Sequence, residues 1–196
     1  MLATPSTTVI IAGVNKTQLL DHLSKIDAGL TAPASLCIYG SAAFILLDEP
    51  DRTSLDVDVA APYSDANFAD LSRAAVAAGL PINPAPDTSG EHIEWIQAAR
   101  LCLAPPTAGR VVLLWQGARL KIVTVPPPDL IASKLIRYDE LDQADIAYLW
   151  AQQPLAWTDI AAAVQRLPEP FAHDPVVRDN LANLKADFPQ APEHMP

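Results

Sequence analysis

The chain has 196 residues, of which 50% are apolar and 18% are charged, and its formal net charge is −10. This length fits one domain, or one domain with a small appendage, and no apolar run is long enough to cross a bilayer. The acidic balance argues against broad nucleic-acid binding, which requires clustered lysine and arginine. No basic residues precede the first apolar run, and Cys37 and Cys102 lie in apolar stretches, so we expect a cytoplasmic protein with two buried, reduced thiols.

The first two thirds of the chain mix helices with strands, as judged from the spacing of apolar residues. The expected helices cover residues 16–30, 41–49 and 64–79, and the expected strands cover 35–40, 54–60, 92–103, 111–115 and 120–125, the last two as a hairpin. Asn15 or Thr17 can cap the first helix, and Gly79 can cap the end of the third.

The last third is expected to be helical. Asp129 is expected to cap a helix that follows three prolines. A second helix is expected to begin with Asp142 as its N-cap and Asp145 in its first turn, and a third with Thr158 as its cap. A further helix is expected at 174–188, before a frayed end.

This order of elements predicts an α/β (α+β) fold, with a mixed sheet flanked by helices. Residues 1–125 are expected to form the core, and residues 126–190 a helical C-terminal part packed on it.

Two aspartates, Asp56 and Asp58, alternate with apolar residues in the strand predicted at 54–60. Residues i and i+2 of a strand point to the same face, about 6.6 Å apart along the backbone. Adjacent carboxylates repel each other unless a cation lies between them, and a hard divalent ion such as Mg²⁺ takes oxygen ligands. The alternative is an edge strand with a wet outer face, on which both aspartates are solvated.

Gly40 and Ser41 stand where the strand at 35–40 gives way to a helix. A turn of small residues lets backbone N–H groups approach a phosphate closely, and the following helix N-terminus favours negative charge. The turn and the aspartate pair together predict a phosphate-binding turn beside metal ligands.

These residues resemble the signature of the DNA polymerase beta-like nucleotidyltransferase superfamily, namely Gly40-Ser41, fourteen intervening residues, and Asp56-Val57-Asp58. The run RTSLDVD from Arg52 to Asp58 is similar to the Arg-x-Ser/Thr-x-Asp-x-Asp run of small bacterial branches, which include nucleotidyltransferase toxins of abortive-infection systems. A second motif of these branches is matched by Asp129, Leu130, Lys134, Leu135, Arg137, Asp142 and Asp145. Together the two motifs cover residues 36–150.

The resemblance implies a nucleotidyltransferase-like fold and transfer of a nucleotidyl group from a nucleoside triphosphate, dependent on Mg²⁺ or Mn²⁺. The catalytic residues that it implies are Asp56, Asp58, Lys134 and Asp145, the first two as metal ligands and Lys134 as the contact to the triphosphate. The nucleotide-binding residues that it implies are Gly40, Ser41, Arg52 and Ser54. In one straight helix Lys134 and Asp145 would lie about 16 Å apart, so their convergence requires a break near residues 138–141.

Active members of this superfamily usually carry a third acidic ligand on a neighbouring strand, and the strand expected to hold it, at 120–125, has none. Asp145 could take its place, as could Glu91 or Glu94 if the strand at 92–103 lies beside the aspartates. The gap supports an alternative function, in which a non-catalytic protein binds a cognate toxin or antitoxin, or senses nucleotide. The sequence leaves three classes of acceptor: a tRNA end, a protein side chain and a small molecule. The negative net charge disfavours RNA, and no membrane partner is expected.

Overall fold

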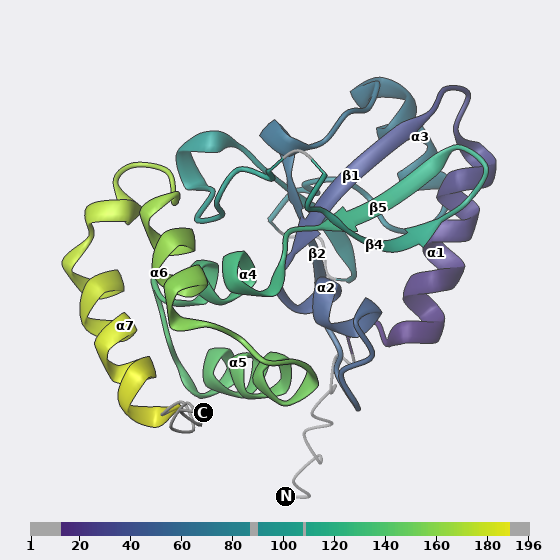
Figure 1. Cartoon of the computed structure of the whole chain (residues 1–196). Coiled ribbons are helices and arrows are strands. Elements are labelled where there is room, and N and C mark those ends of the chain that lie inside the picture. Colours follow the sequence, from purple (N-terminus) through teal and green to yellow (C-terminus); the bar gives the residue numbers. More distant parts are fainter. Residues whose placement is uncertain (1–12, 87–89, 108, 189–196) are drawn as a thin grey trace, which may run out of the picture.

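A five-stranded mixed sheet forms the centre of the protein in the computed structural model, which describes residues 13–86, 90–107 and 109–188 (Figure 1). Its strands are β1 (Ala34–Tyr39), β2 (Asp56–Ala60), β3 (His92–Ile96), β4 (Val112–Gln116) and β5 (Leu120–Thr124). Their order is β3-β2-β1-β5-β4, in which the β2–β3 and β1–β5 pairs are parallel and the β1–β2 and β4–β5 pairs are antiparallel. The predicted fold class and the predicted hairpin are confirmed.

Helices cover both faces of this sheet. They are α1 (Lys16–Gly29), α2 (Gly40–Leu46), α3 (Phe68–Ala77), α4 (Pro127–Lys134), α5 (Glu140–Gln152), α6 (Trp157–Gln165) and α7 (Pro175–Asp187). Alternate side chains of a strand point to opposite faces. Leu36 and Ile38 of β1 accordingly pack in one apolar cluster with α1 and α3, whereas Cys37 packs in a second cluster with α4 to α7. Figure 1 shows α4 to α7 grouped on one side of the sheet and α1 with α3 on the other.

Both cysteines are free and buried, as expected, and burial raises the pKa of each thiol to about 12. None of the described helices is long and apolar enough to span a bilayer. The division of the chain at residue 125 stays a prediction, and the frayed end expected after residue 188 lies outside the described residues.

Strand β2 lies inside the sheet, between β1 and β3. The alternative that its aspartates sit on a wet edge strand is therefore wrong. Val57 and Val59 are buried on one face of β2, and Asp56 and Asp58 are half-buried on the other. An interior position holds both carboxylates against neighbouring elements, so solvation alone does not account for the pair.

The first helix has the predicted cap. Asn15 accepts a hydrogen bond from the backbone N–H of Gln18, whose side chain accepts one from the Asn15 N–H, which completes a capping box. At the end of α3 the prediction is off by one residue. Ala78 is the C-cap, and Gly79 follows it in the left-handed conformation, with φ of 78°.

Three predicted caps in the last third of the chain are wrong. Helix α4 begins two residues before Asp129, since proline at its first position fits a helix start, and the Asp129 carboxylate instead accepts a hydrogen bond from Arg166. The N-cap of α5 is Asp139, which accepts from the backbone N–H of Asp142. Helix α6 begins at Trp157, one residue before Thr158, and has no side-chain cap.

The predicted break between Lys134 and Asp145 is confirmed. Helix α4 ends at Lys134, α5 begins at Glu140, and Tyr138 between them has a positive φ of 54°. The chain turns back in this interval, so the first turns of α5 face the end of α4. The strand expected at 92–103 is shorter than predicted, because β3 ends at Ile96 and a 3-10 turn covers Ala98–Arg100.

Candidate functional site

Three carboxylates meet on one face of the sheet, at strands β2 and β3. One oxygen from each of Asp56, Asp58 and Glu94 lies within 4.8 Å of the others. The parallel pairing of the two strands places Glu94 directly beside Asp58, which brings both side chains to the same face. Glu94 also accepts a hydrogen bond from the exposed Arg100 at 2.8 Å. Within the described residues, this is the group of acidic, histidine or cysteine side chains that is close enough to hold a metal ion.

Asp58 occupies the centre of this cluster and has an unusual charge environment. Its pKa is raised from 3.8 to about 7, first by burial and then by the neighbouring carboxylates of Asp56 and Glu94, while Lys134 and Arg137 oppose the shift. Three acidic groups in such a setting resist full ionisation unless a cation joins them. The cluster is therefore short of positive charge in the metal-free protein.

The turn at Gly40 lies directly against Asp58. Gly40 has φ of 64°, a region that favours glycine, and a Cβ at this position would overlap with Oδ2 of Asp58. Ser54 supports the cluster from the other side, since its hydroxyl donates to Asp56 Oδ1 at 2.9 Å. Two of the four residues that the resemblance assigns to nucleotide binding, Gly40 and Ser54, thus contact or adjoin the two aspartates.

Behind the cluster lies a buried network of charged groups that joins the two sequence motifs. Asp145, fully buried on α5, lies 2.5 Å from Lys134 Nζ and 2.7 Å from Arg52 Nη1. Arg52 also donates to Ser41 Oγ at 2.7 Å. A buried carboxylate needs such partners to remain charged. The network fixes α5 against the end of α4 and against the start of α2.

A cavity of about 220 Å³ opens beside the carboxylates, between the end of β1 and the α4–α5 turn. Its lining includes Gly40, Asp58, Lys134 and Arg137. Arg137 holds Asp142 with two hydrogen bonds, from Nε at 2.9 Å and from Nη2 at 2.8 Å. Although burial acts against it, Arg137 and Lys134 lower the pKa of Asp142. The cavity is thus lined by Asp58 on the β2 side and by Lys134 and Arg137, both paired with Asp142, on the α4–α5 side.

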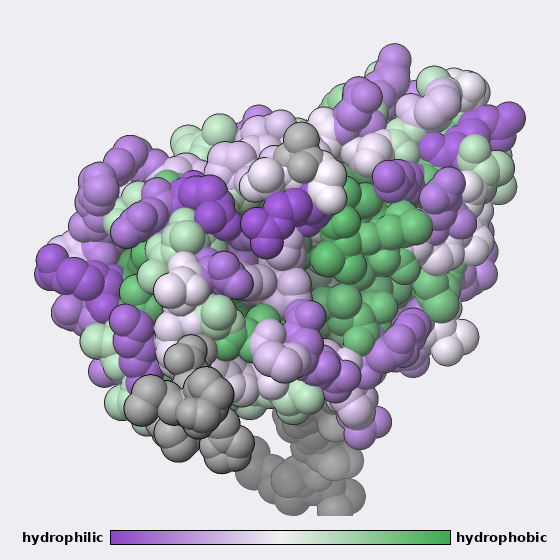
Figure 2. All heavy atoms as spheres, in the orientation of Figure 1, coloured by the Kyte–Doolittle hydropathy of each residue, from purple (hydrophilic) through white to green (hydrophobic). Residues whose placement is uncertain are grey.

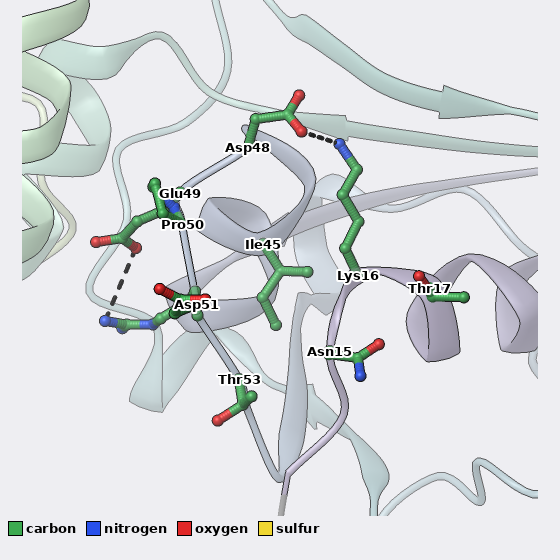
Figure 3. A pocket seen from close by; sticks show the side chains of 10 residues that line it. Asn15, Lys16, Thr17, Ile45, Asp48, Glu49, Pro50, Asp51 and Thr53 are labelled. Carbon is green, nitrogen blue, oxygen red and sulfur yellow. Dashed lines mark hydrogen bonds and ion pairs between the residues drawn. The ribbon is translucent and has the colours of Figure 1, made fainter.

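A second hollow, of about 440 Å³, lies on the other side of Arg52 (Figure 3). It is lined by the start of α1 and by the loop at 48–53. Lys16 and Asp48 form an ion pair across it, and Glu49 points away from that pair toward the Arg52 guanidinium, 3.8 Å away. Its charged groups are therefore largely paired with one another, and it lacks the three-carboxylate arrangement of the first cavity.

The structure brings together most of the residues singled out in the sequence. Asp56, Asp58 and Gly40 adjoin the cavity or its carboxylates, and Lys134 lines it. Ser41, Arg52 and Asp145 lie in the buried network instead. The third acidic side chain is Glu94, whereas Glu91 lies 3.7 Å from His22 outside the cluster.

One feature of the site was predicted from the sequence only as an alternative, and a second was missed. The strand at 120–125 was the expected neighbour of β2, but β5 pairs with β1, and β3 occupies that place. The glutamate of a short strand with alternating polar residues was the available signal for the third ligand. Arg137 belongs to the second motif, but the motif assigned it no role, and its place at the cavity emerges only from the turn between α4 and α5.

Comparison with known proteins supports a nucleotidyltransferase family, without identifying the abortive-infection branch that the motifs resemble. A family model described as "Nucleotidyltransferase of unknown function (DUF6036)" matches residues 17–166. No curated protein and no solved structure matches the chain. The matched region contains β1 to β5, the carboxylate cluster and the buried network, and it spans well over half of the sequence. The chain therefore belongs to this nucleotidyltransferase family of unknown function.

Proposed function

We propose that the protein transfers a nucleotidyl group from a nucleoside triphosphate to an acceptor, with a divalent cation held by Asp56, Asp58 and Glu94. The observation that carries this proposal is the approach of three carboxylate oxygens to within 4.8 Å of one another. Mg²⁺ binds oxygen at about 2.1 Å, so ligands on opposite sides of it are about 4.2 Å apart. Small side-chain adjustments would let the cluster hold Mg²⁺, or Mn²⁺, which also takes carboxylate ligands.

The bound cation would neutralise charge on the reacting phosphate. The residues of the chain would position the triphosphate. Gly40 has no side chain, so the Asp58 carboxylate lies directly against the turn that opens α2, and a triphosphate held by the cation would lie beside this turn. In this proposal Asp145 acts by holding Lys134 and Arg52 in place.

The reaction would join an acceptor oxygen to the α-phosphorus and break the bond from that phosphorus to the bridging oxygen, so that pyrophosphate leaves. The acceptor hydroxyl loses its proton to solvent or to a carboxylate of the cluster. The net charge of −10 favours a protein side chain or a small molecule over RNA as the acceptor.

Titration of ATP, GTP, CTP and UTP into the protein, with and without Mg²⁺, tests this function by calorimetry. We expect at least one nucleotide to bind with Mg²⁺ and to lose that binding in Asp58→Ala and Asp56→Ala. Asp21→Ala is the matched control, because Asp21 is an exposed aspartate paired with Lys25 on α1. If no nucleotide binds, or if both cluster variants bind normally, the proposal is wrong.

A second candidate function is binding of a protein partner, for instance the cognate member of a toxin–antitoxin or phage-defence pair. It is favoured by the edge strand β4, whose outer edge has no strand beside it in the described part of the chain. Apolar side chains gather over β4 and β5 (Figure 2), and Leu113 is 53% exposed. Such edges pair readily with a strand of another chain. Loss of a co-purifying partner in Leu113→Lys, with nucleotide binding intact, would support this function, whereas partner retention would oppose it.

A further inference from the structure

Two cations line the cavity beside Asp58, and they differ in how their charge is used. Lys134 and Arg137 both belong to the segment where α4 turns into α5. Either could in principle meet the phosphates of a nucleotide. Their burial and their partners separate the two roles.

Lys134 is enclosed and doubly paired. Its side chain is 8% exposed, and its Nζ lies 2.5 Å from Asp145 and 3.1 Å from Asp142. The ammonium group also lies over the ring of the fully buried Phe44, at 5.2 Å from the ring centroid. Two carboxylates and an aromatic face already balance this charge. Moving Lys134 toward a ligand would take one cationic partner away from each of two buried carboxylates of α5.

Arg137 is held along one edge and open along the other. Its side chain is 59% exposed, its Nε and Nη2 bind Asp142, and Nε also lies 2.7 Å from Asp139. Nη1 of Arg137 makes no hydrogen bond or ion pair with any of the described residues. A planar guanidinium can bind one carboxylate and still donate to a phosphate from its remaining N–H groups.

We propose that Arg137 is the residue that contacts the triphosphate, while Lys134 is a positioning residue that holds α5 against α4. This inference rests on the proposed function, since it names the residue that recognises the phosphates of the same substrate. Asp142 and Asp139 hold the guanidinium by Nε and Nη2, and Arg137 lines the same cavity as Gly40 and Asp58. The pair of motifs thus supplies metal ligands from β2 and a phosphate contact from the α4–α5 turn.

The test compares Arg137→Ala, Arg137→Lys and Lys134→Met, with Arg178→Ala as the matched control. Arg178 is an exposed arginine on α7, also paired with an aspartate. Calorimetry would measure the Kd for the four nucleoside triphosphates with Mg²⁺ and for inorganic tripolyphosphate with Mg²⁺. Circular dichroism would measure Tm for each variant in the absence of ligand.

We expect Arg137→Ala to weaken both kinds of ligand by about tenfold or more, the loss of one charge-assisted hydrogen bond, and to lower Tm less than Lys134→Met does, because Arg137 is the more exposed of the two side chains. Arg137→Lys should recover only part of the affinity, because an ammonium group lacks the planar, forked set of N–H donors of a guanidinium. Lys134→Met should lower Tm, and below that Tm it should weaken the binding of both ligands less than Arg137→Ala does. Arg178→Ala should match wild type in both measurements.

Two results would overturn this inference while leaving the proposed function standing. One is wild-type affinity in Arg137→Ala, and the other is a folded Lys134→Met protein that no longer binds. If the wild-type protein binds neither tripolyphosphate nor any nucleotide, the proposed function fails and this inference fails with it. Tripolyphosphate has no base or sugar, so an equal loss for both ligand types assigns the contact to phosphate.

Discussion

Removal of the charge of Asp58 should stabilise the metal-free protein at neutral and alkaline pH. Asp58→Asn keeps the size of the side chain but removes a carboxylate whose pKa is raised, first by burial and then by Asp56 and Glu94, from 3.8 to about 7. In the native state this group stays protonated up to about pH 7, whereas in the unfolded chain it ionises near its ordinary pKa. In this interval the native state therefore binds one proton more than the unfolded chain does. Wild-type stability consequently falls as pH rises from about 4 to about 7.

The size of the effect follows from the same shift. Each pH unit between the two pKa values costs about 1.4 kcal/mol, so the full shift of about three units corresponds to about 4 kcal/mol above pH 7. Between pH 5 and pH 8 the advantage of Asp58→Asn over wild type should grow by about 3 kcal/mol. Added Mg²⁺ should reverse this order, because it stabilises only the protein whose cluster can bind it.

Urea unfolding of both proteins at pH 5, 6, 7 and 8, in the presence of a chelator, measures this difference directly. The comparison between variants cancels the contributions of titrating groups that do not interact with Asp58. A difference that stays flat over this range would refute the reasoning, as would a wild-type protein that is more stable than Asp58→Asn at pH 8 without metal. The same series with Mg²⁺ would show whether the cluster binds the ion.

Three other changes have definite expected outcomes. Asp145→Asn should lower the free energy of unfolding by about 3–5 kcal/mol in urea denaturation, because it leaves Lys134 and Arg52 buried without their shared partner; a loss below about 1 kcal/mol would contradict the network. Gly40→Ala should cost at least about 1 kcal/mol and abolish Mg²⁺-dependent nucleotide binding in calorimetry, because its φ of 64° disfavours a side chain and its Cβ would overlap with Asp58. Glu94→Gln should weaken Mn²⁺ binding by about tenfold, which is about 1.4 kcal/mol, as measured by electron paramagnetic resonance. Glu91→Gln is the control and should not change Mn²⁺ binding; equal effects of the two substitutions would show that Glu94 is not a metal ligand.

Local sequence patterns were sufficient for the elements that carry the site. The alternation of apolar residues and aspartates predicts β2, and the small-residue turn predicts the start of α2, because both depend on neighbours a few positions away. The break between α4 and α5 was predicted from the length of a straight helix, because such a helix would hold Lys134 and Asp145 too far apart to converge. Capping was less predictable, because an aspartate near a helix start has competing partners. Asp142 binds Arg137 and Lys134 rather than capping α5.

The position of the third carboxylate could not be derived from local patterns, since it depends on which strand lies beside β2. Helix α3 connects β2 to β3 as a crossover, and its packing against α1 brings β3 back in parallel to the outer side of β2. The register between β2 and β3 then decides which side chains lie next to one another on this face. Asp58 lies beside Glu94, and a slip of one residue would turn Glu94 to the opposite face of the sheet. The packing of α3 on α1, remote from the cavity, is therefore among the determinants of the carboxylate cluster.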